Sequence, residues 1–376
     1  MHYFIFPEKD TTIFEASSSL NSGMDEILEI RKNVSDTGAS VDVSRILIKF
    51  DTTYFQEASA SGLIPHTGSR AAKYYLNLYD ANPKALAASQ SLYAYPVSGS
   101  WDMGTGRSYD NPQTADGCSW KYRYSETNGT LWASGSGAED GAGGIWYTSS
   151  VAPAASASLN HQTRDLKIDV TGTVNSWLNG TIVNDGFLVK RSGSVGNNHP
   201  SASEGNTDRL GNFSFFSSNT HTIFPPTLEA VWDDSTWSTG SLDALTSTNL
   251  EDSVIYMKGL RPKYKENSRA KFRVVGRERF PSKTYSTTPA GLTIKYLPSG
   301  SSYYSITDAE TADVIVPFGT GSKMSCDSTG NYFNLDLNGY QPERYYTLQY
   351  RVVTDEGTAD ELDQYYDEGF TFKVSL

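Results

Sequence analysis

The chain has 376 residues, a formal net charge of −12 and 12% aromatic residues, with 24 tyrosines. This length allows two or three domains, and the composition lacks the Leu, Glu, Lys and Ala dominance of long helices, so it favours an all-β protein. The acidic charge argues against broad nucleic-acid binding, and no apolar stretch approaches the roughly 20 residues of a membrane-spanning helix. Cys118 and Cys326 lie far apart in the sequence, so they predict no disulfide framework and no cysteine-based metal site.

The first residues predict a short strand at Tyr3–Phe6. Their apolar run ends at Pro7 and is followed by Glu8, Lys9 and Asp10. A secretory signal needs a basic start and about 7 to 15 apolar residues. We therefore identify no signal peptide in this segment.

Short alternating segments separated by Gly, Ser, Asn and Asp predict the strands of a sandwich or barrel. In SRILIKFD, residues Ile46, Ile48 and Phe50 share one face, which predicts a core strand. Further strands are predicted at 73–79 and 92–97.

The next part of the chain combines long loops with a strand and a helix. Residues 98–159 are rich in Gly, Ser, Ala and Asp, so we expect loops that cover the sheet and are pinned by buried tryptophans. Residues 166–177 alternate and then repeat at helical spacing, which predicts a strand followed by a two-turn helix. We expect Trp101, Trp120 and Trp177 to fill the core rather than to stack on sugars.

The order of these segments resembles a known family. DTTIFE, NSGMDEILEI, SRILIKFD, AAKYYLNLYDA, YAYPVSGSWDMGTG, GCSWKYR, DLKIDVTGTVNSWLNG, DGFLVK, FSFFSS and PPTLEAVW follow one another as in the DNRLRE-type jelly roll, a relative of carbohydrate-binding modules. The resemblance covers residues 1–234 and implies a jelly-roll β-sandwich. Through these relatives it also raises glycan binding as an alternative function.

A second domain is expected at 251–376, after a polar, Ser/Thr-rich linker at 235–250. About eight predicted strands suggest an immunoglobulin-like sandwich. These strands are expected at 254–257, 270–275, 292–297, 303–306, 314–318, 332–337, 345–353 and 370–376. The stretch that begins YYSITDAETADVIVPFGTG resembles a domain of structural proteins in T4-like tailed phages, notably those of marine cyanobacteria.

The sequence offers no catalytic motif. It has no HExxH or HxH pair, no GxSxG elbow and no GxxxxGK[ST] loop, and no two carboxylates are paired by spacing. We therefore expect a protein that is not an enzyme and has no cofactor. Related jelly rolls often hold a structural cation near the ends of the domain, which implies a calcium site; the competing interpretation is that these carboxylates only supply solubility. The candidate ligands are Asp10, Glu15, Asp233 and Asp234.

Two segments of opposite charge stand out. Residues 258–283 carry ten Lys or Arg against two Glu, whereas residues 354–370 carry seven carboxylates and no base. They either neutralise one another within one domain or form complementary docking patches between subunits. The candidate interface residues are Lys263, Lys265, Arg277, Arg279, Asp355, Glu356, Asp360 and Glu361.

The resemblances and the missing signal predict a structural protein of a tailed bacteriophage, made in the host cytoplasm and built into the virion. The expected location is the neck, tail, baseplate or a fibre attachment, and a capsid decoration role stays open. The expected partners are other virion proteins and further copies of this chain, with no nucleic acid and no membrane. The alternative is a carbohydrate-binding adhesin, which a row of exposed aromatic side chains would favour.

Overall fold

The computed structural model describes residues 1–376 apart from 36–40, 85, 88, 126–128, 133–141, 148–153, 161–164, 194–203, 283–284, 286, 289–290 and 356. The fold is all-β, as the composition predicts. The described α-helices are α1 (Thr53–Ala60) and α2 (Thr171–Leu178), and no described helix is long and apolar enough to cross a membrane.

The chain forms two compact units. The C-terminal unit comprises Met1–Phe4, Thr67–Ala72 and Ala230–Leu376, and the N-terminal unit comprises Ile5–His66 and Lys73–Glu229. The domain limits expected from the sequence, at 234 and 251, stay a prediction.

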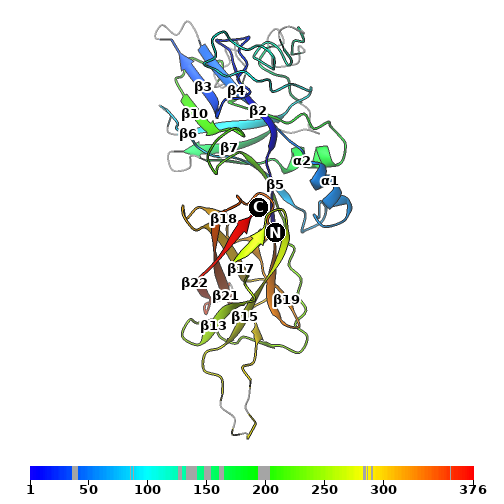
Figure 1. The fold of residues 1–376 in the computed structure, drawn as a ribbon, viewed down its shortest axis with the longest axis vertical. Coiled ribbons are helices and arrows are strands. Elements are labelled where there is room, and N and C mark those ends of the chain that lie inside the picture. Colours follow the sequence, from blue (N-terminus) through cyan, green and yellow to red (C-terminus); the bar gives the residue numbers. More distant parts are fainter. Residues whose placement is uncertain are drawn as a thin grey trace. The chain divides into compact units, whose positions relative to one another are not determined.

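The N-terminal unit is built on two sheets (Figure 1). The β4 sheet contains, in order, β10 (Gly211–Phe216), β3 (Ile27–Val34), β4 (Val41–Phe50), β9 (Phe187–Lys190), β6 (Ser89–Pro96) and β7 (Ala155–Asn160), and β2 (Pro7–Phe14) also pairs with β4. The β5 sheet contains β1 (His2–Ile5), β11 (Thr227–Val231), β5 (Lys73–Leu78) and β8 (Leu166–Asp169). The limits of the two units fall within β1 and β11.

Strand β4 is buried on both faces. Ile46, Ile48 and Phe50 are fully buried, as their alternation predicts. On the opposite face, Leu47 belongs to a core cluster with several tryptophans of the 98–159 segment. Buried Trp101, Trp120 and Trp132 hold the described loops of this segment on the sheet, as expected, whereas its last residues, 155–159, form most of β7 instead of a loop.

The strand-to-helix transition predicted at 166–177 is confirmed by β8 and α2. Trp177 on α2 is buried, with its ring 4.7 Å from that of Phe187, so it fills the core as expected. Helix α1 had no recognised sequence signal. Its buried Phe55 packs against Tyr74 with ring centroids 5.3 Å apart.

A buried charge cluster surrounds Glu204 in the N-terminal unit. The Glu204 carboxylate accepts hydrogen bonds from Arg45 Nε at 3.2 Å and Nη2 at 2.7 Å, and from Lys190 Nζ at 3.1 Å. Lys32 Nζ donates to the Glu204 carbonyl at 2.6 Å, and the Arg45 guanidinium lies 4.7 Å from the Trp120 ring centre. Burial lowers the pKa of Lys190 to about 8 despite the nearby carboxylate. Charges this deep persist only because they are paired.

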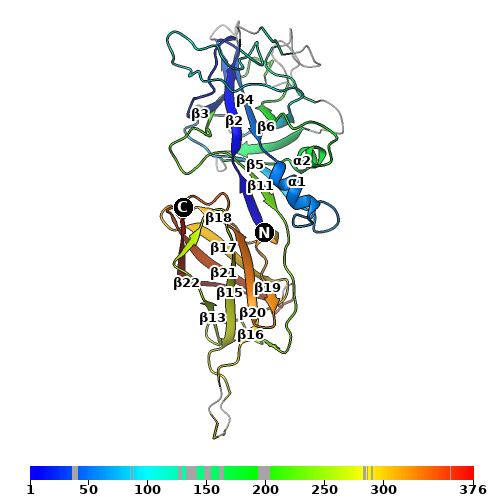
Figure 2. The same cartoon turned by 45° about the vertical axis from the view of Figure 1, so that its right-hand side comes forward.

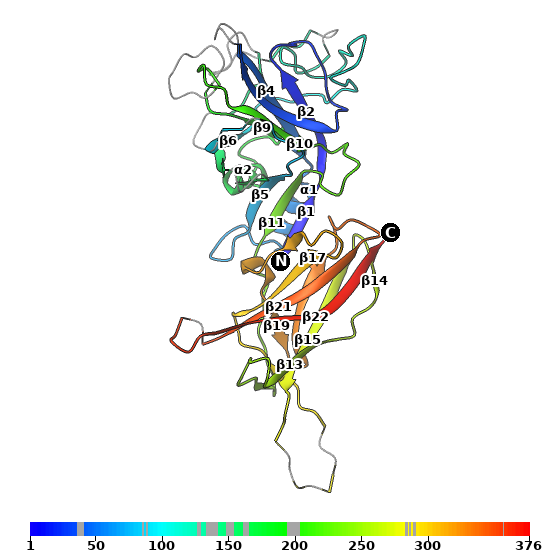
Figure 3. The same cartoon turned by 90° about the vertical axis from the view of Figure 1, so that its left-hand side faces the viewer.

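The C-terminal unit also contains two sheets (Figures 2 and 3). The β15 sheet contains β12 (Asp243–Ala244), β16 (Lys295–Tyr296), β15 (Arg269–Glu278), β20 (Gly330–Asp336) and β19 (Ser325–Asp327), and β13 (Ser253–Lys258) pairs with β15. The β22 sheet contains β14 (Lys263–Lys265), β22 (Leu362–Ser375), β21 (Tyr345–Thr354), β17 (Ser302–Asp308) and β18 (Val314–Val316).

Aromatic side chains join these two sheets. Tyr304 of the β22 sheet stacks on Phe333 of the β15 sheet with ring centroids 4.0 Å apart. The ring centroids of Phe272 in the β15 sheet and Phe372 in the β22 sheet lie 5.2 Å apart. Each pair therefore joins one sheet to the other across a buried interior. The packing is sandwich-like, with the core between the sheets.

The segment 235–250 supplies β12 and the core residue Leu245. Two other sequence expectations need correction in this unit. The strand expected at 292–297 is only Lys295–Tyr296. The last strand begins at Leu362 instead of residue 370. The sequence did not reveal this start, because Tyr366 is the only buried residue among those described in the acidic segment, and the outward carboxylates show no alternation.

Candidate binding groove

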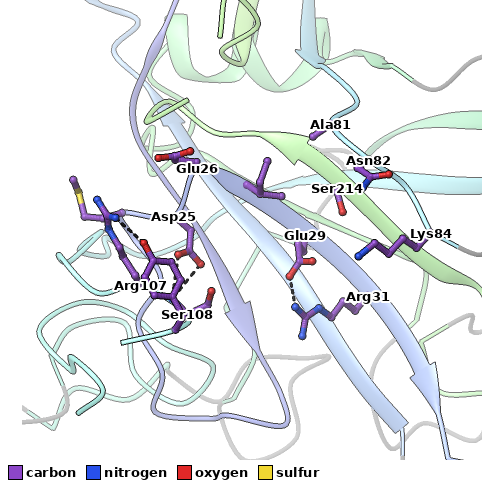
Figure 4. A pocket seen from close by; sticks show the side chains of 13 residues that line it. Asp25, Glu26, Glu29, Arg31, Ala81, Asn82, Lys84, Arg107, Ser108 and Ser214 are labelled. Atoms are coloured by element: carbon purple, nitrogen blue, oxygen red, sulfur yellow. Dashed lines mark hydrogen bonds and ion pairs between the residues drawn. The ribbon is translucent and has the colours of Figure 1, made fainter. Parts of the chain in front are cut away.

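An open groove of about 460 Å³ lies on the outer part of the β4 sheet, beside strands β3 and β10. It is lined by Met24, Asp25, Glu26, Ile27, Glu29, Arg31, Ala81, Asn82, Lys84, Arg107, Ser108, Tyr109 and Ser214. Figure 4 shows Glu29 and Arg31 next to each other, with Ser214, Asn82 and Lys84 beside them and Asp25, Arg107 and Ser108 on the opposite side. Register explains this layout, because Ser214 of β10 pairs with Glu29 of β3.

The charged side chains on the strand side are held in place. Arg31 Nη2 donates to Glu29 Oε2, and the Arg31 guanidinium lies 4.8 Å from the Phe14 ring centre. Because residues two apart on a strand share a face, Glu29 and Arg31 both point outward from β3. Lys84 and Asn82 differ: within the described part of the chain, neither side chain has a hydrogen-bond partner, so both can bind a ligand.

The opposite wall comes from the 98–159 loops. The Arg107 Nη1 group donates to the Tyr109 hydroxyl at 2.7 Å, and the Tyr109 side chain is 72% exposed. Ser108 N donates to the Asp25 carboxylate at 3.1 Å, and partial burial raises the pKa of Asp25. The wall therefore offers an accessible ring beside a fixed guanidinium.

Asn21 fixes the loop that carries this wall. Its buried amide donates to the Met103 and Cys118 carbonyls at 2.7 and 2.8 Å and accepts from Gly106 N at 2.8 Å. A Cβ at Gly106 would lie 2.6 Å from the backbone carbonyl oxygen of Asn21, so only glycine fits at this position. Sequence reasoning missed Asn21, because its partners lie more than 80 positions away.

The lining holds three cations, Arg31, Lys84 and Arg107, and three carboxylates, Asp25, Glu26 and Glu29. Such a balance favours an uncharged ligand rich in hydrogen-bonding groups over a strongly charged one.

The calcium candidates are divided between the two units. In the N-terminal unit, Asp10 is buried and accepts from Ser218 N at 2.7 Å and Ser218 Oγ at 2.8 Å. Burial raises the pKa of Asp10 to about 6. Glu15 has a buried Oε2 without a hydrogen-bond partner, and partial burial raises its pKa.

In the C-terminal unit, Asp233 Oδ1 accepts from Ser235 N at 2.9 Å and Oγ at 2.6 Å, and Asp233 Oδ2 lies 3.6 Å from Lys323 Nζ. Asp234 lies 3.2 Å from the amino group of Met1. Among the residues that the structure describes, no three His, Cys, Asp or Glu side chains gather around one metal position. The calcium site stays a prediction from the resemblance.

The predicted basic interface residues lie in two places. Lys263 and Lys265 are exposed on β14, at the edge of the β22 sheet, where Arg261 is exposed as well; we call these three residues the basic edge. Arg277 and Arg279 lie at the far end of β15, in the other sheet. One sequence segment therefore contributes to two surfaces.

Arg279 is engaged within its own unit. Its Nη2 donates to the Leu250 carbonyl at 2.8 Å, and its backbone N donates to the Asp252 carbonyl at 2.7 Å. Arg277 Nη1 donates to the neighbouring Glu278 carbonyl at 3.0 Å. Both arginines therefore have structural partners, and the lysines of β14 are better candidates for binding another molecule.

The acidic interface residues gather at the turn between β21 and β22. We call the exposed Asp355, Asp360 and Glu361 the acidic tip. Glu361 accepts from Gly357 N at 2.8 Å. Glu356 lies outside the described residues.

Comparison with known proteins adds no identification: no family model and no curated protein matches the chain. The likeness to DNRLRE-type jelly rolls and to cyanophage structural domains therefore rests on the sequence motifs alone.

Proposed function

We propose that the protein is a non-enzymatic structural component of a tailed-bacteriophage particle that assembles with other virion proteins. The observation that carries this proposal is the exposure of both the basic edge and the acidic tip. Among the described residues, Lys263, Lys265, Asp360 and Glu361 form no ion pair, so their charges are available to a partner. Exposed patches of this kind steer docking and fix its register.

In this proposal, the N-terminal unit is a jelly roll displayed outward or against a neighbour, and the C-terminal unit is an immunoglobulin-like docking sandwich. The phage setting is supported by the sequence resemblance of the stretch that begins YYSITDAETADVIVPFGTG in the C-terminal unit. The state of the thiols is consistent with a structural role: Cys118 is fully buried, and burial raises the pKa of Cys326 to about 11. Neither thiol ionises appreciably at neutral pH.

Purified particles provide the test. We expect wild-type protein to remain with the particles through gradient purification, and Lys263→Glu/Lys265→Glu to reduce its abundance there at least about tenfold without changing its melting temperature. Lys73→Glu/Lys121→Glu, which reverses two other exposed lysines, is the matched control and should assemble normally. Absence of the wild-type protein from purified particles would contradict the proposal.

A second function, saccharide binding, is favoured by the groove. A sugar presents hydroxyl groups that donate and accept hydrogen bonds, together with an apolar face that stacks on an aromatic ring. The balanced charges of the groove, the unpartnered Lys84 and Asn82, and the exposed Tyr109 suit such a ligand. Burial of Trp101, Trp120 and Trp177 removes these tryptophans as alternative platforms.

Titration of the full chain with neutral oligosaccharides tests this second function. We expect Tyr109→Ala to weaken binding at least about tenfold, which corresponds to about 1.4 kcal/mol. Tyr345→Ala removes a partly exposed tyrosine from the C-terminal unit and should leave affinity unchanged. Equal affinity of wild type and Tyr109→Ala would exclude the groove as the binding site.

A further inference from the structure

The basic edge and the acidic tip lie at opposite ends of one strand. Lys263 of β14 pairs with Lys373 near the end of β22, whereas the acidic tip immediately precedes Leu362, where β22 begins. Lys373 lies eleven positions after Leu362, which at about 3.3 Å per residue gives roughly 35 Å. Figure 3 shows β22 and β21 running between these ends.

For the lysines of the basic edge, this separation excludes the first of the two interpretations left open by the sequence, neutralisation within one domain. Side chains of Lys and Glu span only a few Å each, so the lysines of the basic edge cannot neutralise the acidic tip of the same copy. At this distance, the interaction through solvent is also screened, because the Debye length is about 8 Å at physiological salt. Each copy therefore presents two complementary charged ends that are independent of each other.

The basic edge has room for a partner. Strand β14 pairs with β22 on one side and ends the β22 sheet on the other. The Glu343 carboxylate is bonded to Lys373, and the nearby Lys263 charge helps to lower the pKa of Glu343. The lysine ammonium groups thus remain available at a sheet edge, where short strands with lysines are open to solvent.

Apolar side chains accompany the acidic tip. Thr354 Oγ1 lies 2.5 Å from Thr248 Oγ1, which places the 248–252 turn beside the tip. On this turn, Leu250 is 43% exposed, and Phe280, which follows Arg279, is 80% exposed. The bond from Arg279 to the Leu250 carbonyl ties these two segments together. Exposed apolar groups rimmed by polar side chains mark surfaces that dock on other proteins.

We propose that copies of this chain associate head to tail, with the acidic tip of one copy on the basic edge of the next. This inference rests on the proposed assembly function and names one partner for it, a second copy. The contact is heterologous, because each copy uses two different surfaces, so it generates a ring if the rotation closes and a filament if it does not.

The test uses two charge-reversal variants of the full chain. The edge variant carries Lys263→Glu and Lys265→Glu, and the tip variant carries Asp360→Lys and Glu361→Lys. Sedimentation equilibrium should show that wild-type protein associates at low ionic strength and dissociates as salt is added. Each variant alone should associate at least about tenfold more weakly, because like charges then face each other.

An equal mixture of the two variants should recover association. The acidic tip of the edge variant meets the unchanged basic edge of the tip variant, and the reversed surfaces meet each other. Lys73→Glu/Lys121→Glu serves as the control for a general charge effect, and melting curves verify that each variant is folded. Monomeric wild type, variants that associate like wild type, or a mixture that stays monomeric would each overturn the proposal.

These outcomes are separate from those of the particle experiment. If wild type is monomeric but the edge variant is lost from particles, the basic edge binds a different virion protein and the head-to-tail proposal is wrong. If copies associate but wild-type protein is absent from particles, the association stands and the virion function is wrong.

Discussion

Removing the carboxylate of Glu204 should strongly destabilise the N-terminal unit. Glu204→Gln leaves Arg45 and Lys190 buried and faces them with an amide that can accept but carries no charge. Breaking a buried pair by removing one partner costs about 3–5 kcal/mol, since the remaining charge is desolvated without compensation. For a domain of 150–250 residues, each kcal/mol lowers the melting temperature by about 2–4 °C, so a decrease of roughly 10 °C is expected.

Thermal and guanidinium unfolding at pH 7 measure this effect. Glu26→Gln is the matched control, because its carboxylate is largely exposed, and it should change stability by less than about 0.5 kcal/mol. A Glu204→Gln variant within 1 kcal/mol of wild type, about one third of the smallest expected effect, would refute the reasoning.

The pH dependence gives a second check on the same cluster. The folded-state pKa of Lys190 is about 8, below the ordinary 10.5, so the unfolded chain binds more protons between these values. Stability from this group should therefore rise with pH from about 8 to 10.5. The Lys190→Met variant should show a smaller rise, because Lys9 and Lys32, whose pKa values burial also lowers, keep their contributions.

Three further outcomes are expected. Burial raises the pKa of Asp10 from 3.8 to about 6, so between these pH values the folded state binds a proton that the unfolded chain has lost. The contribution of Asp10 to stability should therefore fall by up to about 3 kcal/mol as the pH rises from 3.8 to about 6. The Asp10→Asn variant should not show this loss, which unfolding at pH 4 and at pH 7 measures. Trp177→Ala should cost about 3–5 kcal/mol in denaturant unfolding through the cavity it leaves, and a fully stable variant would contradict its core role. Chymotrypsin should cut first after Tyr285, whose side chain is fully exposed, and an earlier cut within 234–252 would support a free linker there.

Local periodicity predicted the elements whose signal is local. Ile46, Ile48 and Phe50 alternate because β4 crosses the core, and the transition from β8 to α2 follows a change of period within a few residues. The same reasoning failed for the first half of β22, since its outward carboxylates show no apolar alternation around Tyr366.

The sequence did not predict the candidate binding groove, for a different reason. Glu29 and Arg31 lie on a strand, whereas Arg107 and Tyr109 lie on a loop that Asn21 anchors across more than 80 residues. No pattern within one segment predicts that Asn21 will form hydrogen bonds with a loop so far away in the sequence. Composition did reveal the charged segments, but only the register of β14 with β22 shows that the lysines of the basic edge lie roughly 35 Å from the acidic tip.

Zero-length carbodiimide cross-linking of purified particles, followed by mass spectrometry of the peptides, tests the central claim most directly. The reaction joins a carboxylate only to an amine in contact with it, and the Lys373–Glu343 and Lys295–Glu278 ion pairs supply internal positive controls within each copy. The account predicts links from Asp360 or Glu361 to Lys263 or Lys265, which the length of β22 permits only between copies. Particles that yield the control links without any link between the acidic tip and the basic edge, or that contain no peptide of this protein, would contradict it.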